Sequence, residues 1–257
     1  GLTDELRSLT ELEPLVVLRS GNEAVWPARL LDVVAPSPGQ LRDQGDAKRI
    51  MTAAWIAGRL LRVLGVNVHL APDLSIGPWG RDDQEVINNA GTFNRYQRKQ
   101  GILGCAPPFP GGASAVDLDV EAMLRSPLLP FTALMPELDG ILLSPRVFPE
   151  IDPGQPASRS PAIITRLLRD QLGYKRLVIA DTGDPASIMA GADLVIAPDA
   201  AAAPAVLAGL GGLSGYVLSD AIDRIEYARK RLHKPTRPTP KVLERLRQDA
   251  RDLDELL

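Results

Sequence analysis

The chain has 257 residues, of which 45% are hydrophobic and 24% are charged, and its net charge is −3. This composition is ordinary for a globular protein with a buried core, and the length suits one α/β barrel or two smaller domains. The lack of a basic excess argues against nucleic acid or an anionic membrane surface as a partner, and no apolar run reaches the roughly 20 residues of a membrane span. One cysteine and two histidines exclude a disulfide framework and make a metal site unexpected. We expect no cofactor.

The first residues, GLTDELRSLTELE, lack the charged start and apolar middle of a signal peptide. We therefore expect a cytoplasmic protein. The initial Gly in place of Met leaves open a processed chain that has lost an export signal. The oligomeric state does not follow from the sequence.

Short apolar runs rich in Val, Ile and Leu recur along the chain, as is typical of parallel strands covered on both faces. We predict strands over 15–18, 66–72, 101–107, 140–145, 176–181 and 193–199. Helical patterns lie between them, over 47–65, 83–101 and 162–172, and a further helix begins in the alanine-rich stretch 199–209. The segment 151–161, IDPGQPASRSP, is predicted as a proline-rich loop.

The alternation of strands and helices predicts an α/β fold with a parallel sheet. Six strands, against the eight of a closed barrel, favour a TIM-like (β/α) barrel that is incomplete or irregular. We place this domain at residues 1–232. Residues 233–257 are predicted as a linker, HKPTRPTP, followed by a surface helix.

Asp181 directly follows the apolar run RLVIA, at the carboxyl end of a predicted strand. Parallel α/β folds place their chemistry at these strand ends. The position alone therefore makes Asp181 a candidate catalytic residue.

Several segments resemble, in the same order, motifs of the barrel domain of glycoside hydrolase family 3, in particular its bacterial β-N-acetylglucosaminidase branch. They are LVVLRSGNEAVW, LGVNVHLAPDLSI, APPFPGGASAVDLD, IDPGQPASRSP and RDQLGYKRLVIAD, and the resemblance covers about residues 6–232. It implies a TIM-like barrel and retaining hydrolysis of amino sugars, with a cell-wall fragment as the ligand.

By this resemblance Asp181 falls on the family's catalytic nucleophile. Retaining hydrolysis also needs a group that protonates the leaving oxygen, which in this branch is a His positioned by an Asp two residues away. Asp117 matches that Asp, whereas Asp119 stands where the His is expected. Asp119 or Asp117 would then have to act as the acid. The alternative is that both carboxylates are solvated or cap a helix.

The sugar-binding positions depart from the family's pattern. Pro107 and Pro108, which carry no side-chain donors, replace a Lys-His pair. An Arg in the loop after the third strand is missing, and Arg81 is the nearest substitute, unless it is only a surface arginine. Trp79, in the same loop, is a candidate for stacking on a sugar ring.

Two arginines near predicted strand ends change the charge of the expected pocket. Arg19 replaces an acid of the family, and Arg146 replaces a residue that is usually His. They could pair with Asp181 and neighbouring acids and so fill the site, which we favour, or they could bind an anionic ligand such as a carboxylate-bearing sugar.

The remaining candidates have structural interpretations. We expect His69 to be a hydrogen-bonded histidine of the core or of the barrel end, Cys105 to be a small buried hydrophobe and Trp55 to lie in the core. Asp184, which precedes Pro185, is expected to cap a helix.

Two hypotheses follow for function. The first is a relative of the β-N-acetylglucosaminidases acting on cell-wall amino sugars, with lost or altered activity, because fold does not carry function once site residues change. The second is a non-catalytic carbohydrate- or protein-binding domain.

Overall fold

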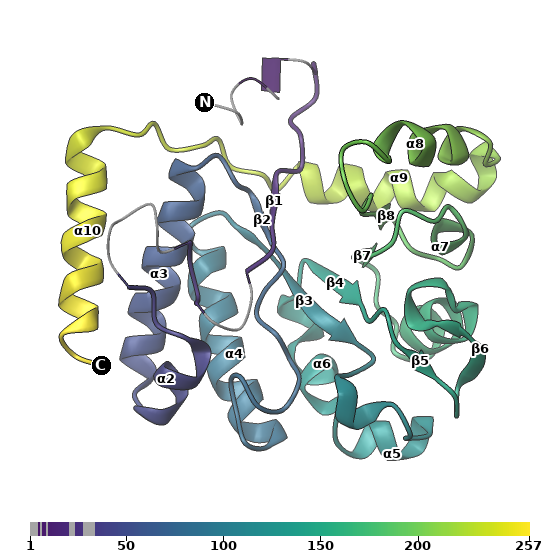
Figure 1. The fold of residues 1–257 in the computed structure, drawn as a ribbon, viewed down its shortest axis with the longest axis horizontal. Coiled ribbons are helices and arrows are strands. Elements are labelled where there is room, and N and C mark those ends of the chain that lie inside the picture. The colour runs from purple at the N-terminus through teal and green to yellow at the C-terminus, as the bar shows by residue number, and fades with distance from the viewer. Residues whose placement is uncertain (1–4, 6, 9, 21–23, 28–33) are drawn as a thin grey trace. The chain divides into compact units, whose positions relative to one another are not determined.

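The computed structural model describes residues 5, 7–8, 10–20, 24–27 and 34–257 (Figure 1). The chain divides into two compact units. The first comprises Gly1–Cys105 and Arg231–Leu257, and the second comprises Ala106–Lys230. The predicted boundary at residue 232 stays a prediction of domain organisation.

The first unit holds β1 (Val17–Leu18), β2 (Val68–His69) and the start of β3 (Leu103–Phe109). The strands are parallel, with Val17 opposite Val68 and Val68 opposite Leu103. Its helices are α2 (Pro38–Asp43), α3 (Ala47–Val63), α4 (Asp83–Arg98) and α10 (Pro240–Asp254). The strands and the helices α3 and α4 lie where the apolar patterns predict them.

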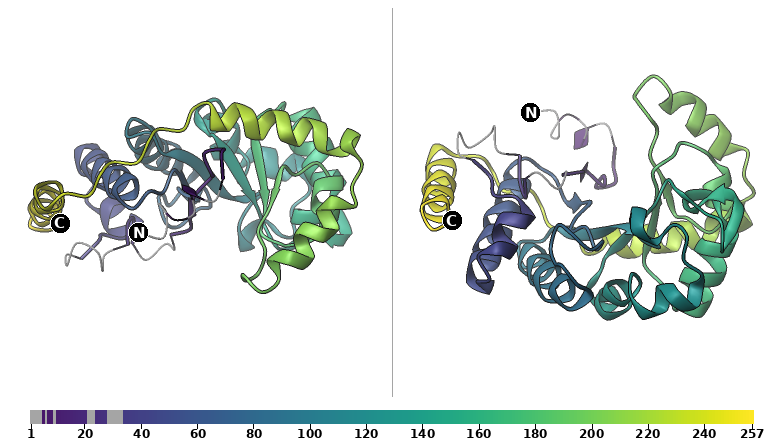
Figure 2. Two further views of the ribbon diagram at one scale, coloured as in Figure 1. Left: turned by 90° about the horizontal axis from the view of Figure 1, so that it is seen from above. Right: turned by 60° about the horizontal axis from the view of Figure 1, so that its bottom comes forward.

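Helix α10 packs against α3, far from it in the sequence, and the two lie side by side in Figure 1 and in both views of Figure 2. Thr239 caps its first turn by accepting from the N–H of Val242. Its buried face repeats at helical spacing and consists of Leu246, Ala250 and Leu253. The segment before it is fixed by a backbone bond of 3.1 Å from the Thr236 N–H to the Arg62 carbonyl.

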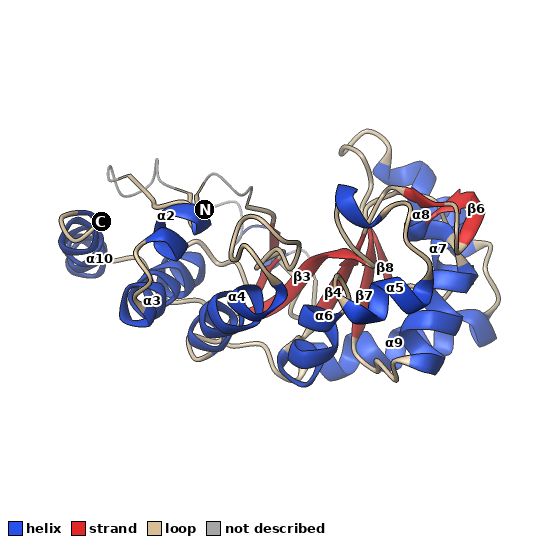
Figure 3. Cartoon of the chain, turned by 90° about the horizontal axis from the view of Figure 1, so that it is seen from below, coloured by secondary structure: helices blue, strands red, loops and turns tan. Residues whose placement is uncertain are grey.

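The second unit holds the end of β3 with β4 (Gly140–Leu143), β7 (Leu177–Ala180) and β8 (Leu194–Val195). Figure 3 shows β4, β7 and β8 as neighbours, and both of their pairings are parallel. All four residues of β4 and all four of β7 are buried. This agrees with their continuous apolar sequences.

The helices of the second unit include α5 (Val120–Arg125), α6 (Leu129–Leu134), α7 (Ala186–Met189), α8 (Ala203–Gly211) and α9 (Gly215–Arg229). The predicted helix over 162–172 is present as η5 (Ala162–Gln171), but it has π-helical hydrogen bonding. Its apolar side is buried as the amphipathic pattern predicts.

The expected loop over 151–161 is more regular than predicted. β5 (Val147–Phe148) and β6 (Asp152–Pro156) form a two-stranded antiparallel ribbon, which leads into a 3₁₀ turn, η4 (Ala157–Arg159). The prediction of a loop was wrong over β6. Proline lacks a backbone N–H but is tolerated in an edge strand such as this one.

Among the described residues, six parallel strands follow in the order β1-β2-β3-β4-β7-β8, with β3 shared between the two units. This confirms the predicted α/β fold of an incomplete (β/α) barrel. No single helix of the described ranges is long and apolar enough to cross a membrane. Only α8 and α9 taken together, at 119° to each other, reach the required length and composition.

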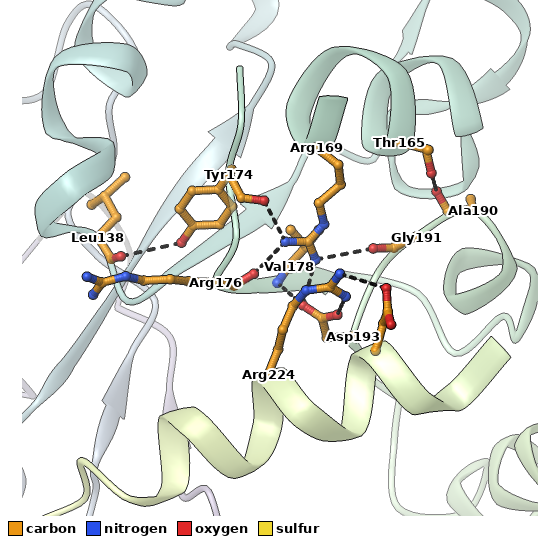
Figure 4. A network of polar contacts seen from close by, with 11 residues as sticks. Leu138, Thr165, Arg169, Tyr174, Arg176, Val178, Ala190, Gly191, Asp193 and Arg224 are labelled. Atoms are coloured by element: carbon orange, nitrogen blue, oxygen red, sulfur yellow. Dashed lines mark hydrogen bonds and ion pairs between the residues drawn. The ribbon is translucent and has the colours of Figure 1, made fainter. Parts of the chain in front are cut away.

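A buried carboxylate joins four elements of the second unit (Figure 4). The side chain of Asp193 is fully buried, and its Oδ2 accepts from Arg169 Nη2 at 2.7 Å and from the Val178 N–H at 2.8 Å. Its Oδ1 accepts from Arg224 Nη1 at 2.9 Å. Burial raises the pKa of Asp193, and the two guanidinium groups oppose that rise.

We predict that Asp193→Ala lowers the free energy of unfolding by about 3–5 kcal/mol, because it leaves a buried guanidinium group unpaired. Urea denaturation measures the change. Asp220→Ala is the matched control, since Asp220 pairs with the same Arg224 from a side chain that is 78% exposed, and it should cost less than about 1 kcal/mol. Equal losses of unfolding free energy in Asp193→Ala and Asp220→Ala would contradict the view that the buried carboxylate stabilises the second unit.

His69 lies in the core of the first unit, as predicted, with both ring nitrogens in hydrogen bonds. Nδ1 lies 2.8 Å from Oε1 of Gln97, an acceptor, so Nδ1 carries the proton. Nε2 therefore accepts from the Ser20 hydroxyl at 2.7 Å. Burial lowers the pKa of His69 to about 4, against an ordinary value of 6.5.

This pKa shift predicts a loss of stability in acid. Below pH 6.5 the unfolded chain binds a proton at His69, whereas the folded chain does so only near pH 4, so the free energy of unfolding falls as the pH drops between these values. The proton binding of His69 lowers the free energy of unfolding by about 3 kcal/mol in total across this pH range. Urea denaturation from pH 7 to pH 4 should show a shallower fall for His69→Gln than for the unchanged chain. Parallel profiles would refute the prediction.

Candidate functional site

Asp181 follows the buried strand β7 directly and is half-buried at its carboxyl end. The chain then turns sharply, with the Asp184 N–H donating to the Thr182 hydroxyl at 3.3 Å. The sequence therefore places a carboxylate at the rim of the second unit's sheet, held by a strand that is buried throughout.

Asp184 fixes the loop that carries Asp181. Its Oδ1 accepts from the Ala186 N–H at 2.9 Å, in the first turn of α7, as the predicted capping role requires. Its Oδ2 pairs with Arg159 Nη1 at 2.8 Å. The backbone hydrogen bond from Ala186 and the guanidinium group of Arg159 lower the pKa of Asp184. Arg159 thereby connects residues 156–160, which we call the PASRS turn, to the loop after β7.

The PASRS turn is itself held by a buried hydroxyl. Ser160 is fully buried, and its Oγ donates to Asp152 Oδ2 at 2.6 Å while accepting from the Ile163 N–H at 3.2 Å. Arg159 and Ser160 were not predicted as contributors to the site. The motif PASRS was visible in the sequence, but their partners, Asp184 and Asp152, become clear only in the fold.

The Phe-Pro-Gly segment ends β3. The ring of Phe109 is buried edge-on against Phe131, with centroids 5.3 Å apart at 88°. The carbonyl of Phe109 accepts from the Ser144 N–H at 2.8 Å. Gly111 follows, where an added Cβ would lie 2.6 Å from that of Ala115. Only glycine fits this close approach.

Asp117 and Asp119 are both exposed. Asp117 lies in the turn after the short 3₁₀ helix η2 (Ala113–Ala115). Asp119 is the N-cap of α5, and its Oδ1 accepts from the Ala122 N–H at 2.7 Å. The structure thus gives Asp119 the capping role that the sequence left open as an alternative.

Arg146 is exposed and lies beside the PASRS turn, since its carbonyl accepts from the Ala157 N–H at 2.8 Å. It comes from the segment between β4 and β5. The second unit therefore contains Asp117, Asp119, Arg146 and Asp181.

The other three candidates belong to the first unit. Arg19 is exposed immediately after β1. Trp79 is only 2% exposed, and its ring packs on Phe93 with centroids 4.8 Å apart, so it lies in the core and not at a surface. Arg81 is exposed and pairs with Asp43 at 2.7 Å.

No group of three or more His, Cys, Asp or Glu side chains in the described part of the chain is placed to hold a metal ion. Cys105 is buried, as expected of a small core residue. The chemistry available at the end of β7 is therefore that of carboxylates, hydroxyls and the guanidinium groups of Arg146 and Arg159.

Comparison with known proteins agrees with this arrangement. The glycosyl hydrolase family 3 N-terminal domain matches residues 27–213. The chain is 27% identical to a β-hexosaminidase of Methylococcus capsulatus over 204 residues, 70% of this chain and 61% of that protein. A β-hexosaminidase of Pseudomonas aeruginosa is 25% identical over 211 residues, 68% of this chain and 63% of that protein.

Solved structures show the same fold. The β-N-acetylglucosaminidase of Thermotoga maritima superposes with a TM-score of 0.76 at 22% identity, over 91% of this chain and 59% of that one. A β-N-acetylglucosaminidase from Paenibacillus superposes with a TM-score of 0.71 at 23% identity, over 85% of this chain and 53% of that one.

The chain thus spans about three fifths of the length of these two β-hexosaminidases. The family match covers most of the chain and includes β7 with Asp181, the Phe-Pro-Gly segment and the PASRS turn. The chain belongs to glycosyl hydrolase family 3, whose N-terminal domain occupies residues 27–213.

Proposed function

We propose that this protein binds β-linked amino sugars at the carboxyl end of β7 and retains Asp181 as a glycosidase nucleophile, but lacks an efficient acid to protonate the leaving group. Its relatives are named β-hexosaminidases. The observation that carries the proposal is the contrast between Asp181, half-buried at a strand end, and Asp119, exposed and engaged as a helix cap.

Asp181 is suited to nucleophilic attack. Retaining hydrolysis begins when a carboxylate oxygen bonds to the anomeric carbon while the bond to the leaving oxygen breaks. The loop that carries Asp181 is pinned by Asp184 and Arg159, which limits the movement of the carboxylate. Catalysis depends on such positioning of the reacting group.

Among the described residues of the second unit, no group is equally suited to the protonation step. A general acid must reach the leaving oxygen, and the Asp119 carboxylate already accepts from the first turn of α5. Asp117 is exposed on the neighbouring turn. The loss of one stabilising group commonly costs about 10² to 10³ in rate. Hydrolysis of an ordinary glycoside should therefore be very slow.

Substrate binding also differs from that of the family. Pro107 and Pro108 offer no side-chain hydrogen bonds. Arg146, exposed beside the PASRS turn, is our candidate for binding sugar hydroxyls or a ligand carboxylate. In that role Arg146 would also let the site accept a sugar that carries a carboxylate.

A non-catalytic binding domain is the second candidate. The observation behind it is that large apolar side chains are exposed on three helices of the second unit, α7, α8 and α9. Met189 is 67% exposed, Leu207 is 70% exposed and Tyr216 is 92% exposed.

The missing acid can be tested with two substrates that differ only in their leaving group. Dinitrophenolate is stable without a proton, so 2,4-dinitrophenyl β-N-acetylglucosaminide should be cleaved at least about 100-fold faster than the benzyl glycoside, whose departing alkoxide needs one. Asp181→Asn should abolish cleavage of the activated substrate, and Asp119→Asn should leave it unchanged. Release of dinitrophenolate is followed by absorbance.

Two outcomes separate the candidates. Cleavage of the benzyl glycoside at a rate comparable to that of the activated one would contradict the loss of the acid. If neither substrate is cleaved above the rate in buffer, the proposal that Asp181 is a working nucleophile is wrong, and the non-catalytic binding domain is the remaining candidate.

A further inference from the structure

A cavity of about 800 Å³ lies in the first unit. It is lined by α3, α4 and α10, which pack side by side. Its volume falls within the range typical of small-molecule sites, about 300–1,000 Å³. The cavity depends on α10, because Asp249, Leu253 and Leu256 form one of its walls.

Two aromatic residues line this cavity. Trp55 was predicted to lie in the core, but it is only partly buried, and Tyr96 beside it is likewise accessible. Arg59 lies over the Trp55 ring at 4.4 Å from its centroid, and Lys99 lies over Tyr96 at 3.9 Å. These cation–π contacts fix the ring planes. Met51 and Leu256 complete an apolar lining.

The polar residues around this lining offer both donors and acceptors, with charges that balance. Asp46 lies 3.6 Å from Arg49, and Asp249 Oδ1 lies 2.9 Å from Arg245. The lining thus presents carboxylates from Asp46 and Asp249 next to guanidinium groups from Arg49 and Arg245. Carboxylates accept hydrogen bonds and guanidinium groups donate them. A ligand that both donates and accepts hydrogen bonds therefore suits this lining.

We propose that this cavity, which we call the α3–α10 site, binds a neutral oligosaccharide. A pyranose ring has an apolar C–H face that stacks on Trp55 and Tyr96. Its hydroxyl groups both donate and accept, so they suit walls that combine carboxylates with cationic groups. The balance of charge disfavours a strongly charged ligand. The site is separate from Asp181 and does not depend on hydrolysis there.

Intrinsic fluorescence can report on this site. Trp26 and Trp79 are 1% and 2% exposed, so Trp55 is the one tryptophan of the three that a ligand can reach. Titration of the full chain with triacetylchitotriose should change its fluorescence and saturate. Cellotriose should do the same, because ring faces and hydroxyls are what the site recognises. Calorimetry gives the Kd in parallel.

Four variants test the assignment. Tyr96→Ala and Asp249→Asn should each raise the Kd by about 10-fold, whereas Asp181→Asn should have the same Kd as the wild-type chain. Trp55→Phe keeps an aromatic ring, so its calorimetric Kd should stay within about threefold. Circular dichroism confirms that each variant is folded.

Any of three results would overturn the proposal. The first is the absence of saturable binding of both sugars up to millimolar concentration. The second is binding that Asp181→Asn removes while Tyr96→Ala and Asp249→Asn leave it intact, which would assign it to the end of β7. Saturation by benzyltrimethylammonium without sugar binding would likewise overturn it, since the site would then prefer an apolar cation.

Discussion

The buried carboxylate of Asp193 is the interaction on which the second unit depends. It joins the side chain of Arg169 on η5, the Val178 N–H in β7 and the side chain of Arg224 on α9. A buried ion pair of this kind is costly to break because either partner alone would be an uncompensated charge. The network therefore fixes where β7 lies relative to the helices around it, and Asp181 is the residue at the end of β7.

Further hydrogen bonds and ion pairs hold the residues around Asp181. Asp184, three residues after Asp181, pairs with Arg159, and the PASRS turn that carries Arg159 is held by the buried hydroxyl of Ser160. These contacts hold the loop that carries the Asp181 carboxylate. The residues expected to complete the chemistry lie in exposed turns or, in the case of Asp119, at a helix N-terminus. The loss of catalytic groups that we propose for this retained fold would be a divergence of function on a shared scaffold.

Much of the fold could be predicted because its signals are local. The runs GILL and LVIA are buried on both faces, and continuous apolar sequence indicates that state. The β5–β6 ribbon was missed because Pro153 and Pro156 are typical of loops. For the site, Asp181 and Asp184 were visible from their positions at a strand end and before a helix. The burial of Trp79 depends on Phe93, and the α3–α10 site depends on a helix distant in sequence, so nothing local indicates either.

The central claim is that Asp181 remains a nucleophile, and trapping its glycosyl intermediate tests this most directly. The full chain is incubated with 5-fluoro-N-acetylglucosaminyl fluoride, whose fluoride leaves without protonation and whose second fluorine slows hydrolysis of the intermediate. The account predicts a mass increase of one glycosyl group, mapped by peptide mass spectrometry to Asp181 and absent in Asp181→Asn. An unmodified chain, or a label on another residue, would contradict it.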